Sequence, residues 1–170
     1  MAASASVRLA QMIDAEPIAR IYNEGIVDRM ATFETALQTE ALVAARLRES
    51  PAKYPAVVVE VEGQVVAFAW ASVYRACYEG VAEFSVYVGR DFRGRGYGTR
   101  ALGGLIAEAE RHGLWKLVSR IFPENTGSRQ LCASTGFREV GTYRRHGKLD
   151  GQWRDCVIVE RLIGKAAGGT

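Results

Sequence analysis

Cysteine is scarce in this sequence: its 170 residues include only three, far apart at positions 77, 132 and 156. A secreted disulfide-stabilised domain uses an even and dense set of cysteines, and a zinc site needs closely spaced Cys or His pairs. The pattern therefore excludes a disulfide framework and a zinc cluster, and we expect no metal cofactor.

Strong charge of one sign and long apolar runs are also missing. The formal net charge is only +3, and no motif that reads DNA or RNA is present. No run approaches the roughly 20 apolar residues that cross a bilayer, and the N-terminus lacks the basic-then-apolar order of a secretion signal. We therefore expect a cytosolic protein without a nucleic-acid or membrane partner.

What is present is the composition of one ordinary soluble domain, with 48% hydrophobic and 24% charged residues. We assign residues 1–163 to that domain and the Gly- and Ala-rich residues 164–170 to a flexible tail. Asp14 is expected to cap the first helix, and Glu62-Gly63 and Asp150-Gly151 are expected to turn the chain between strands.

Hydrophobic periodicity predicts a mixed α/β fold in the order βααβββαβαββ, without tandem doubly wound units. Strands are expected at Val7–Ala10, Ala56–Val61, Gln64–Val73, Val81–Val88, Lys116–Phe122, Phe137–Tyr143 and Trp153–Leu162. Helices are expected after Asp14, with Ile18 to Ile26 along one face, and at Thr39–Glu49, Thr99–His112 and Thr126–Thr135.

The most informative segment is a glycine loop that joins the strand Val81–Val88 to an amphipathic helix. Gly94, Gly96 and Gly98 let consecutive backbone N–H groups turn toward one point, where the helix N-terminus adds partial positive charge. Arginines at positions 93, 95 and 100 surround the loop. We therefore expect the loop to bind a pyrophosphate; the alternative is a surface turn with ordinary basic residues.

Two familiar phosphate motifs are excluded by the spacing. A P-loop closes with Gly-Lys-Ser/Thr, whereas Gly98 is followed by Thr99 and Arg100. A dinucleotide fingerprint needs Gly-x-Gly-x-x-Gly and an acid that ends the next strand, and both are missing here. What remains, Arg93-x-x-Gly96-x-Gly98, resembles the acetyl-CoA pyrophosphate loop of the GNAT acetyltransferase superfamily.

Further segments extend this resemblance over roughly Val7 to Leu162. Asn125-x-x-Ser128-x-x-Leu131, followed by Gly136-Phe137, is similar to the superfamily's second cofactor-binding helix. Within the superfamily, the chain is most similar to the phosphinothricin, arsinothricin and methionine sulfoximine acetyltransferases. The segments that carry this similarity are Ala31-Thr32-Phe33-Glu34-Thr35, Arg75-x-x-Tyr78, Ala82 to Val88, and Gly151-Gln152-Trp153-Arg154-Asp155.

The resemblance implies the GNAT fold, a mixed and mostly antiparallel sheet of about seven strands flanked by about four helices. It also implies acetyl-CoA as cosubstrate, a small amino-acid-like substrate and a homodimer. Cofactor contacts are implied for Val86, Tyr87, Val88, Arg93, Gly94, Arg95, Gly96, Tyr97, Gly98, Thr99, Asn125 and Ser128. The alternative for Asn125 is a helix cap before Thr126.

Acetyl transfer to an amine needs a base, and Glu83 lies on the strand that enters the glycine loop. In the related family the matching glutamate is the proposed base; the alternative is a solvated strand residue. The N–H of Val86 is a candidate to bind the developing oxyanion, while residues 86–88 offer backbone groups to the pantetheine arm.

For the substrate, the resemblance implies that Arg75 and Tyr78 hold an acidic group and that Phe33 forms an aromatic wall. The alternatives are a surface arginine and a core phenylalanine. The chain departs from the family at Arg120, expected beside the substrate pocket, and at Cys132, where relatives carry a histidine. A thiol at position 132 is a candidate to reprotonate the leaving CoA thiolate, or else a buried packing residue.

The sequence thus predicts an acetyl-CoA-dependent N-acetyltransferase that acts on the α-amino group of a small acidic amino-acid-like toxin. Two alternatives stay open: acetylation of a protein or peptide amine, and an acyl-CoA-sensing module without turnover. Thiol release in the presence of different amines distinguishes the three.

Overall fold

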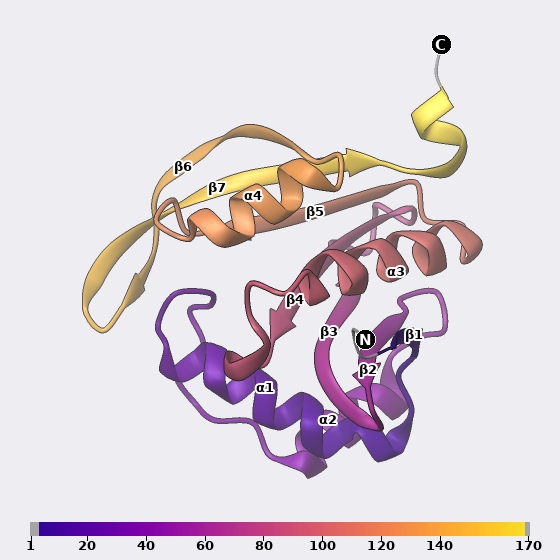
Figure 1. Ribbon diagram of the computed structural model, residues 1–170. Helices are drawn as coiled ribbons and strands as arrows, with labels where there is room; N and C mark the ends of the chain where they lie inside the picture. Colours follow the sequence, from indigo (N-terminus) through magenta and orange to yellow (C-terminus); the bar gives the residue numbers. More distant parts are fainter. Residues whose placement is uncertain (1–3, 169–170) are drawn as a thin grey trace.

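A computed structural model describes residues 4–168 (Figure 1). The strands are β1 (Ala5–Leu9), β2 (Ala56–Val61), β3 (Gln64–Val73), β4 (Val81–Val88), β5 (Lys116–Ile121), β6 (Arg138–Leu149) and β7 (Gln152–Leu162). The α-helices are α1 (Ala15–Val27), α2 (Glu40–Glu49), α3 (Tyr97–Arg111) and α4 (Thr126–Ser134). Short 3-10 helices cover Met12–Asp14, Arg90–Phe92 and, within the expected tail, Gly164–Gly168.

The strands form a seven-stranded sheet in the order β1-β2-β3-β4-β5-β7-β6. Neighbouring strands are antiparallel except β4 and β5, which are parallel. In Figure 1 the indigo and purple part with α1 and α2 and the orange and yellow part with α4 and β5 to β7 lie on either side of β4 and α3. The predicted mixed, mostly antiparallel α/β fold is confirmed.

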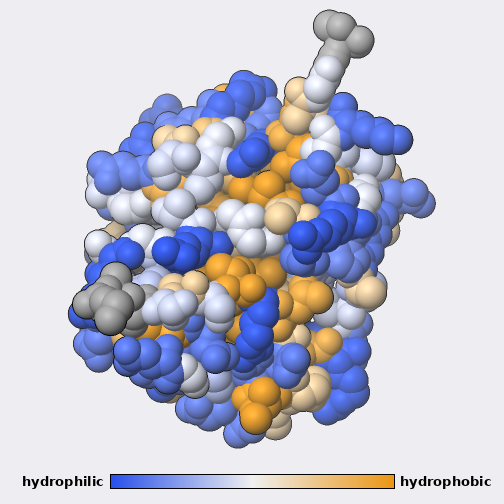
Figure 2. Space-filling model, turned by 45° about the vertical axis from the view of Figure 1, so that its right-hand side comes forward, coloured by the Kyte–Doolittle hydropathy of each residue, from blue (hydrophilic) through white to orange (hydrophobic). Residues whose placement is uncertain are grey.

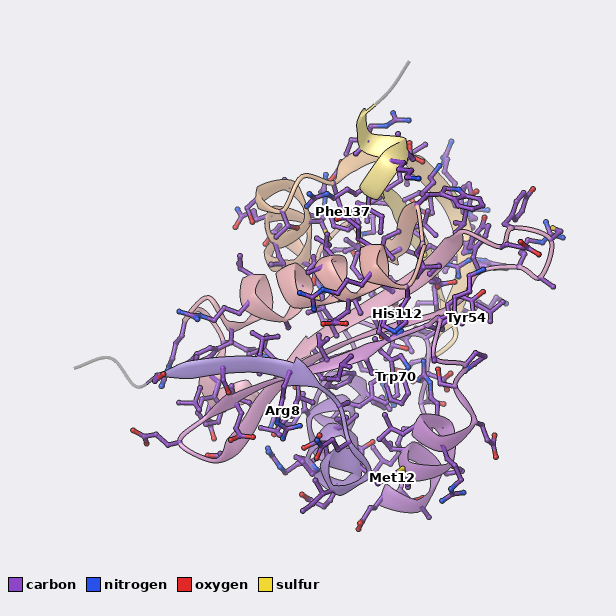
Figure 3. The ribbon with its side chains drawn as sticks, turned by 90° about the vertical axis from the view of Figure 1, so that its right-hand side faces the viewer. Arg8, Met12, Tyr54, Trp70, His112 and Phe137 are labelled. Carbon is purple, nitrogen blue, oxygen red and sulfur yellow. The ribbon has the colours of Figure 1, made fainter. Side chains whose placement is uncertain are left out.

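Two hydrophobic layers hold helices to opposite faces of this sheet. Ile18 of α1 packs in one cluster with Trp70 of β3, and Leu105 of α3 packs in the other, which also contains Phe137. Figure 3 shows Trp70 and Phe137 on the two sides of the sheet. Each fully buried side chain of this size contributes about 1.5–3 kcal/mol, so the two layers hold the helices firmly against the sheet.

Both turns predicted from an acid–glycine pair are confirmed. Glu62 and Gly63 have φ of 50° and 78°, and Asp150 and Gly151 have φ of 48° and 77°. Positive φ at both central residues is what a tight two-residue hairpin turn requires. The second turn brings β7 back along β6, which places the C-terminal hairpin beside β5.

The predicted start of the third helix was wrong: α3 begins at Tyr97, not at Thr99. Gly96 precedes it with a left-handed φ of 82° and places Gly98 inside the first turn. A Cβ on Gly98 would lie 3.1 Å from Leu131 Cδ2 and 3.4 Å from Val88 Cγ2. Glycine stands at position 98 because the start of α3 approaches β4 and α4 closely. In a sequence, a glycine at this point normally indicates a loop.

Asp14 stands at the N-cap of α1 as predicted, but its side chain does not cap the helix. Its carboxylate accepts hydrogen bonds from Arg8 Nη1 and from the backbone N–H of Gln11, both at 2.7 Å, and makes none to the start of α1. Figure 3 shows Arg8 on β1, where its side chain can reach this buried carboxylate. Asp14 therefore ties β1 to the turn before α1.

The sixth strand is longer than predicted, since it runs to Leu149 rather than ending at Tyr143. The polar residues 144–148 stay in the strand through a bulge, in which Arg145 has a φ of 49°. Asp155 of β7 accepts a hydrogen bond of 2.6 Å from the Arg145 N–H and holds the bulge in place.

The surface in Figure 2 is mostly hydrophilic, with apolar residues exposed near its centre, beneath the C-terminal end. Among residues 4–168, no helix combines the length and the hydropathy that crossing a bilayer requires.

Candidate active site

The site forms where β4 and β5 diverge. These strands pair only from Val81 to Glu83, against residues 116–118. One residue further, the Ser119 hydroxyl donates a 2.8 Å hydrogen bond to the Phe84 carbonyl, which therefore points toward β5. Because backbone groups alternate along a strand, the N–H and C=O of Val86 face the widening gap. This is the position from which the sequence predicted contacts to a pantetheine arm.

A cleft and a groove meet at this gap. The cleft, of about 720 Å³, is lined by Glu83, Arg120, Cys132 and the loop after α1, among others. The groove, of about 570 Å³, extends to the start of α3. Both are lined by the following residues: Ala31, Val86, Tyr87, Asn125 and Ser128. The two spaces are therefore continuous along β4.

The groove ends at the glycine loop. Gly94 and Gly96 have φ of 75° and 82°, a conformation that glycine adopts without strain. No side chain of residues 4–168 caps α3, so the first N–H groups of this helix keep their capacity to bind an anion. Of the predicted cofactor residues, the following line the groove: Val86, Tyr87, Val88, Arg93, Gly94, Gly96, Gly98, Thr99, Asn125 and Ser128. Arg95 and Tyr97 instead place their side chains against Phe92.

Arg93 is held at the groove by two partners. Its Nη1 donates to Asp28 at 2.7 Å, and its Nε donates to the Val88 carbonyl at 3.2 Å. Arg90 binds the other oxygen of Asp28 at 2.7 Å. Partial burial alone would raise the pKa of Asp28, but the hydrogen bonds from Arg90 and Arg93 hold it below its ordinary value. The carboxylate therefore stays charged and orients both guanidinium groups.

Glu83 and Arg120 form an ion pair in the cleft. Nη2 of Arg120 lies 2.5 Å from each carboxylate oxygen of Glu83. The side chains are 31% and 39% exposed, so the pair is partly shielded from water but reachable from the cleft. Burial alone would lower the pKa of Arg120, and the hydrogen bond and charge of Glu83 raise it. Arg120 is therefore a permanent cation at the predicted base.

Cys132 of α4 is both a cleft residue and a core residue. It lines the cleft, yet it is only 2% exposed and belongs to the large hydrophobic cluster under α3. Burial, followed by the charge of Glu139, raises the pKa of its thiol to about 12. The thiol is therefore fully protonated at neutral pH.

Asn125 caps α4 as the alternative interpretation predicted. Its Oδ1 accepts a 3.1 Å hydrogen bond from the Ser128 N–H. Its Nδ2 donates at 3.1 Å to the carbonyl of Met30, in the loop after α1. One amide thus fixes α4 against the opposite wall of the gap.

Of the four predicted substrate residues, Arg120 lies in the cleft beside Glu83, and the other three lie apart. Phe33 lines the cleft and packs edge-on against Phe122, with ring centroids 4.9 Å apart. Tyr78 lines an adjoining hollow of about 250 Å³, which shares Glu83 and Arg120 with the cleft. Arg75 lies in the exposed turn after β3 and does not line any of these three spaces.

Sequence reasoning missed two cations of the cleft. Arg46 of α2 stacks over the Trp70 ring at 4.3 Å, and Lys148 of β6 lies 4.5 Å from the centroid of Trp153. Lys148 belongs to the basic segment 144–148, whose charge suits an anionic ligand, but neither residue was assigned to the site, because a basic residue on a helix or an edge strand is normally a surface residue. The β6 bulge, which only the structure reveals, brings Lys148 to the cleft.

Known proteins share both the sequence and this architecture. Residues 18–137 match the acetyltransferase (GNAT) family. The chain is 32% identical to an L-methionine sulfoximine/L-methionine sulfone acetyltransferase of Pseudomonas paraeruginosa, over 92% of this chain and 94% of that one. It is 31% identical to a phosphinothricin N-acetyltransferase of Alcaligenes faecalis, over 93% and 82%.

Among solved structures, a GNAT superfamily phosphinothricin acetyltransferase from Sinorhizobium meliloti in complex with acetyl-CoA superposes with a TM-score of 0.89. It is 29% identical, over 98% of this chain and 92% of that chain. The family match and the relatives that span nearly the whole chain indicate one family, and the divergent β4–β5 pair agrees with it. The chain belongs to the GNAT family of N-acetyltransferases, and it is of the phosphinothricin and methionine sulfoximine acetyltransferase type.

Proposed function

We propose that this chain transfers the acetyl group of acetyl-CoA to the α-amino group of a small, acidic, amino-acid-like molecule. Phosphinothricin, arsinothricin and methionine sulfoximine are the leading substrates. The observation that carries the proposal is the continuity of groove and cleft along β4, with Glu83 in the cleft beyond Val86. A thioester in the groove would thereby meet an amine in the cleft.

The residues of the groove fit acetyl-CoA. The uncapped start of α3 and the glycine loop suit its pyrophosphate, and the free edge of β4 at Val86 suits the amides of its pantetheine arm. Acetyl-CoA supplies an activated acetyl group and a thiolate leaving group. The chain must then supply a base, an oxyanion partner and a proton.

Glu83 accepts a proton from the substrate ammonium, directly or through water. Each carboxylate oxygen offers more than one lone pair, so contact with Arg120 leaves room for this proton. The N–H of Val86 donates to the carbonyl oxygen of the acetyl group while the amine nitrogen bonds to its carbon. When the carbon–sulfur bond breaks, the Cys132 thiol donates a proton to the sulfur, and the second proton that the nitrogen loses on becoming an amide returns through water to Cys132. Burial makes this thiol a weak acid, matched to a thiolate desolvated in the same cleft.

The substrate is recognised by charge and by shape. Phe33 forms an apolar wall, and Arg120 attracts an anionic group to the neighbourhood of Glu83. Tyr78 lines the hollow that adjoins the cleft, and we retain it as a residue that approaches the acidic group. The geometry does not support the same role for Arg75, which lines none of the three spaces.

The test is release of free CoA thiol from acetyl-CoA with a panel of amines: the three leading substrates, common amino acids and peptides with a free N-terminus. We expect turnover with the acidic amino-acid analogues. Turnover with peptides alone would favour a protein acetyltransferase, and cofactor binding without thiol release would favour a sensing module.

A further inference from the structure

The β4–β5 register explains why Arg120 meets Glu83. Glu83 pairs with Val118, and Arg120 lies two residues further along the same face of β5. Beyond this point the strands diverge, so the long arginine side chain reaches back across the gap. The pair therefore marks the point at which the cleft opens.

Arg120 uses one of its nitrogens for this contact. Nη2 contacts both oxygens of Glu83, whereas a side-by-side pair would use two nitrogens. A guanidinium has five N–H donors in a fixed plane. Within residues 4–168, Arg120 donates hydrogen bonds only through Nη2, so the donors on Nε and Nη1 can bind a second anion next to the carboxylate of Glu83.

We propose that Arg120 binds the α-carboxylate of the acceptor while Glu83 faces its α-amino group. This assignment rests on the proposed function and deepens it. An α-amino acid carries its amine and carboxylate on one carbon, and the structure places an anion-binding cation and a base in direct contact. An amine without an adjacent carboxylate, such as a peptide N-terminus, cannot use both groups.

The other cations of the cleft are less suited to this role. Arg46 and Lys148 come from α2 and β6, and each is held against a tryptophan ring. Arg120 alone among these three contacts Glu83, and its partial burial strengthens a charge-assisted hydrogen bond. Arg46 and Lys148 remain available for a second acidic group on the substrate.

The experiment compares L-methionine sulfoximine with its α-carboxamide, in the wild type and in Arg120→Met. For the wild type we expect kcat/KM to be roughly 10- to 150-fold lower for the amide, the size of one lost hydrogen bond between charged groups. In Arg120→Met this ratio should fall to within about threefold. If the substitution displaces Glu83, kcat/KM falls by the same factor for both substrates, and this factor cancels in the ratio.

Arg120→Lys keeps the positive charge but not the planar guanidinium group, so we expect an intermediate ratio. If Arg120→Met does not fold, Arg120→Lys tests the assignment in its place. Arg111→Met, at an exposed position of α3, is the matched control and should keep the wild-type ratio. If both Arg120 variants release thiol and keep the wild-type ratio of kcat/KM between the acid and the amide, the assignment of Arg120 is overturned, while the proposed function stands. No thiol release with any free amino acid would refute the proposed function, and this inference with it.

Discussion

Gly98 offers a sharp test of the groove, because a side chain there meets neighbours that are already packed. An added Cβ lies 3.1 Å from Leu131 Cδ2, tighter than ordinary contact, and valine adds two methyl groups beyond it. Overpacking of this kind costs about 1–3 kcal/mol. For a chain of this length each kcal/mol lowers Tm by about 2–4 °C. Gly98→Val should therefore melt roughly 2–12 °C below the wild type.

The same helix provides the control. Gly103 is exposed on α3, and a Cβ there meets no atom within 4 Å. Valine and glycine differ by only a few tenths of a kcal/mol in helix propensity, so Gly103→Val should keep the wild-type Tm within about 2 °C.

The assay is thermal unfolding with and without acetyl-CoA. A ligand at 100 times its Kd stabilises the native state by about 2.7 kcal/mol, which raises Tm by roughly 5–11 °C. Gly103→Val should show that rise in full, and folded Gly98→Val should show almost none, because its side chain narrows the groove at the start of α3. A full rise in Gly98→Val would refute the assignment of this helix start as the pyrophosphate site.

Three further predictions concern Glu83, Cys132 and Asp14. Glu83→Gln should retain the acetyl-CoA-dependent rise in Tm but lose roughly 10²- to 10⁴-fold in turnover, less at high pH where the free amine forms unaided; near-normal turnover at pH 7 would remove Glu83 from the mechanism. Cys132→Ala should lose at least about tenfold more turnover than Cys132→Ser at equal cofactor affinity, and an alanine variant as active as the wild type would leave Cys132 a packing residue only. For Asp14, burial alone would raise the pKa of the carboxyl group, but hydrogen bonds from Arg8 and the Gln11 N–H lower it. The charged carboxylate therefore stabilises the folded protein above the ordinary pKa of aspartate, and this contribution is lost as pH falls through the lowered pKa. Asp14→Asn should cost about 1–3 kcal/mol in urea unfolding at pH 7, and the difference from the wild type should shrink in strong acid; a constant difference would contradict the ion pair.

The sheet could be predicted closely where strands alternate and end in glycine turns. The bounds of β2, β3 and β4 match the prediction residue for residue. Burial on both faces makes β2 and β3 nearly continuous apolar runs, and β4 is rich in β-branched and aromatic residues. The extension of β6 could not be predicted, since an edge strand with polar residues on both faces has no hydrophobic period.

The site could be predicted in its parts but not in its contacts. The glycine loop and Glu83 carry local signals, namely spacing and a lone acid in an apolar strand. The contact of Glu83 with Arg120 depends on the register between strands far apart in the chain. The role of Asp28 at Arg93 likewise depends on how α1 meets the loop after β4, which no local pattern encodes.

The short seam between β4 and β5 also bears on how the molecule opens. Three paired positions join the β1–β4 part of the sheet to the β5–β7 part, whereas β3 and β4 pair at seven positions. Segments with few hydrogen bonds between them separate at low free-energy cost, and their amide protons exchange with solvent early. The hydrophobic cluster under α3 still joins the two parts, so opening at this seam is local. A ligand that spans both walls of the gap adds contacts across the seam, and acetyl-CoA should therefore slow the exchange of its amide protons.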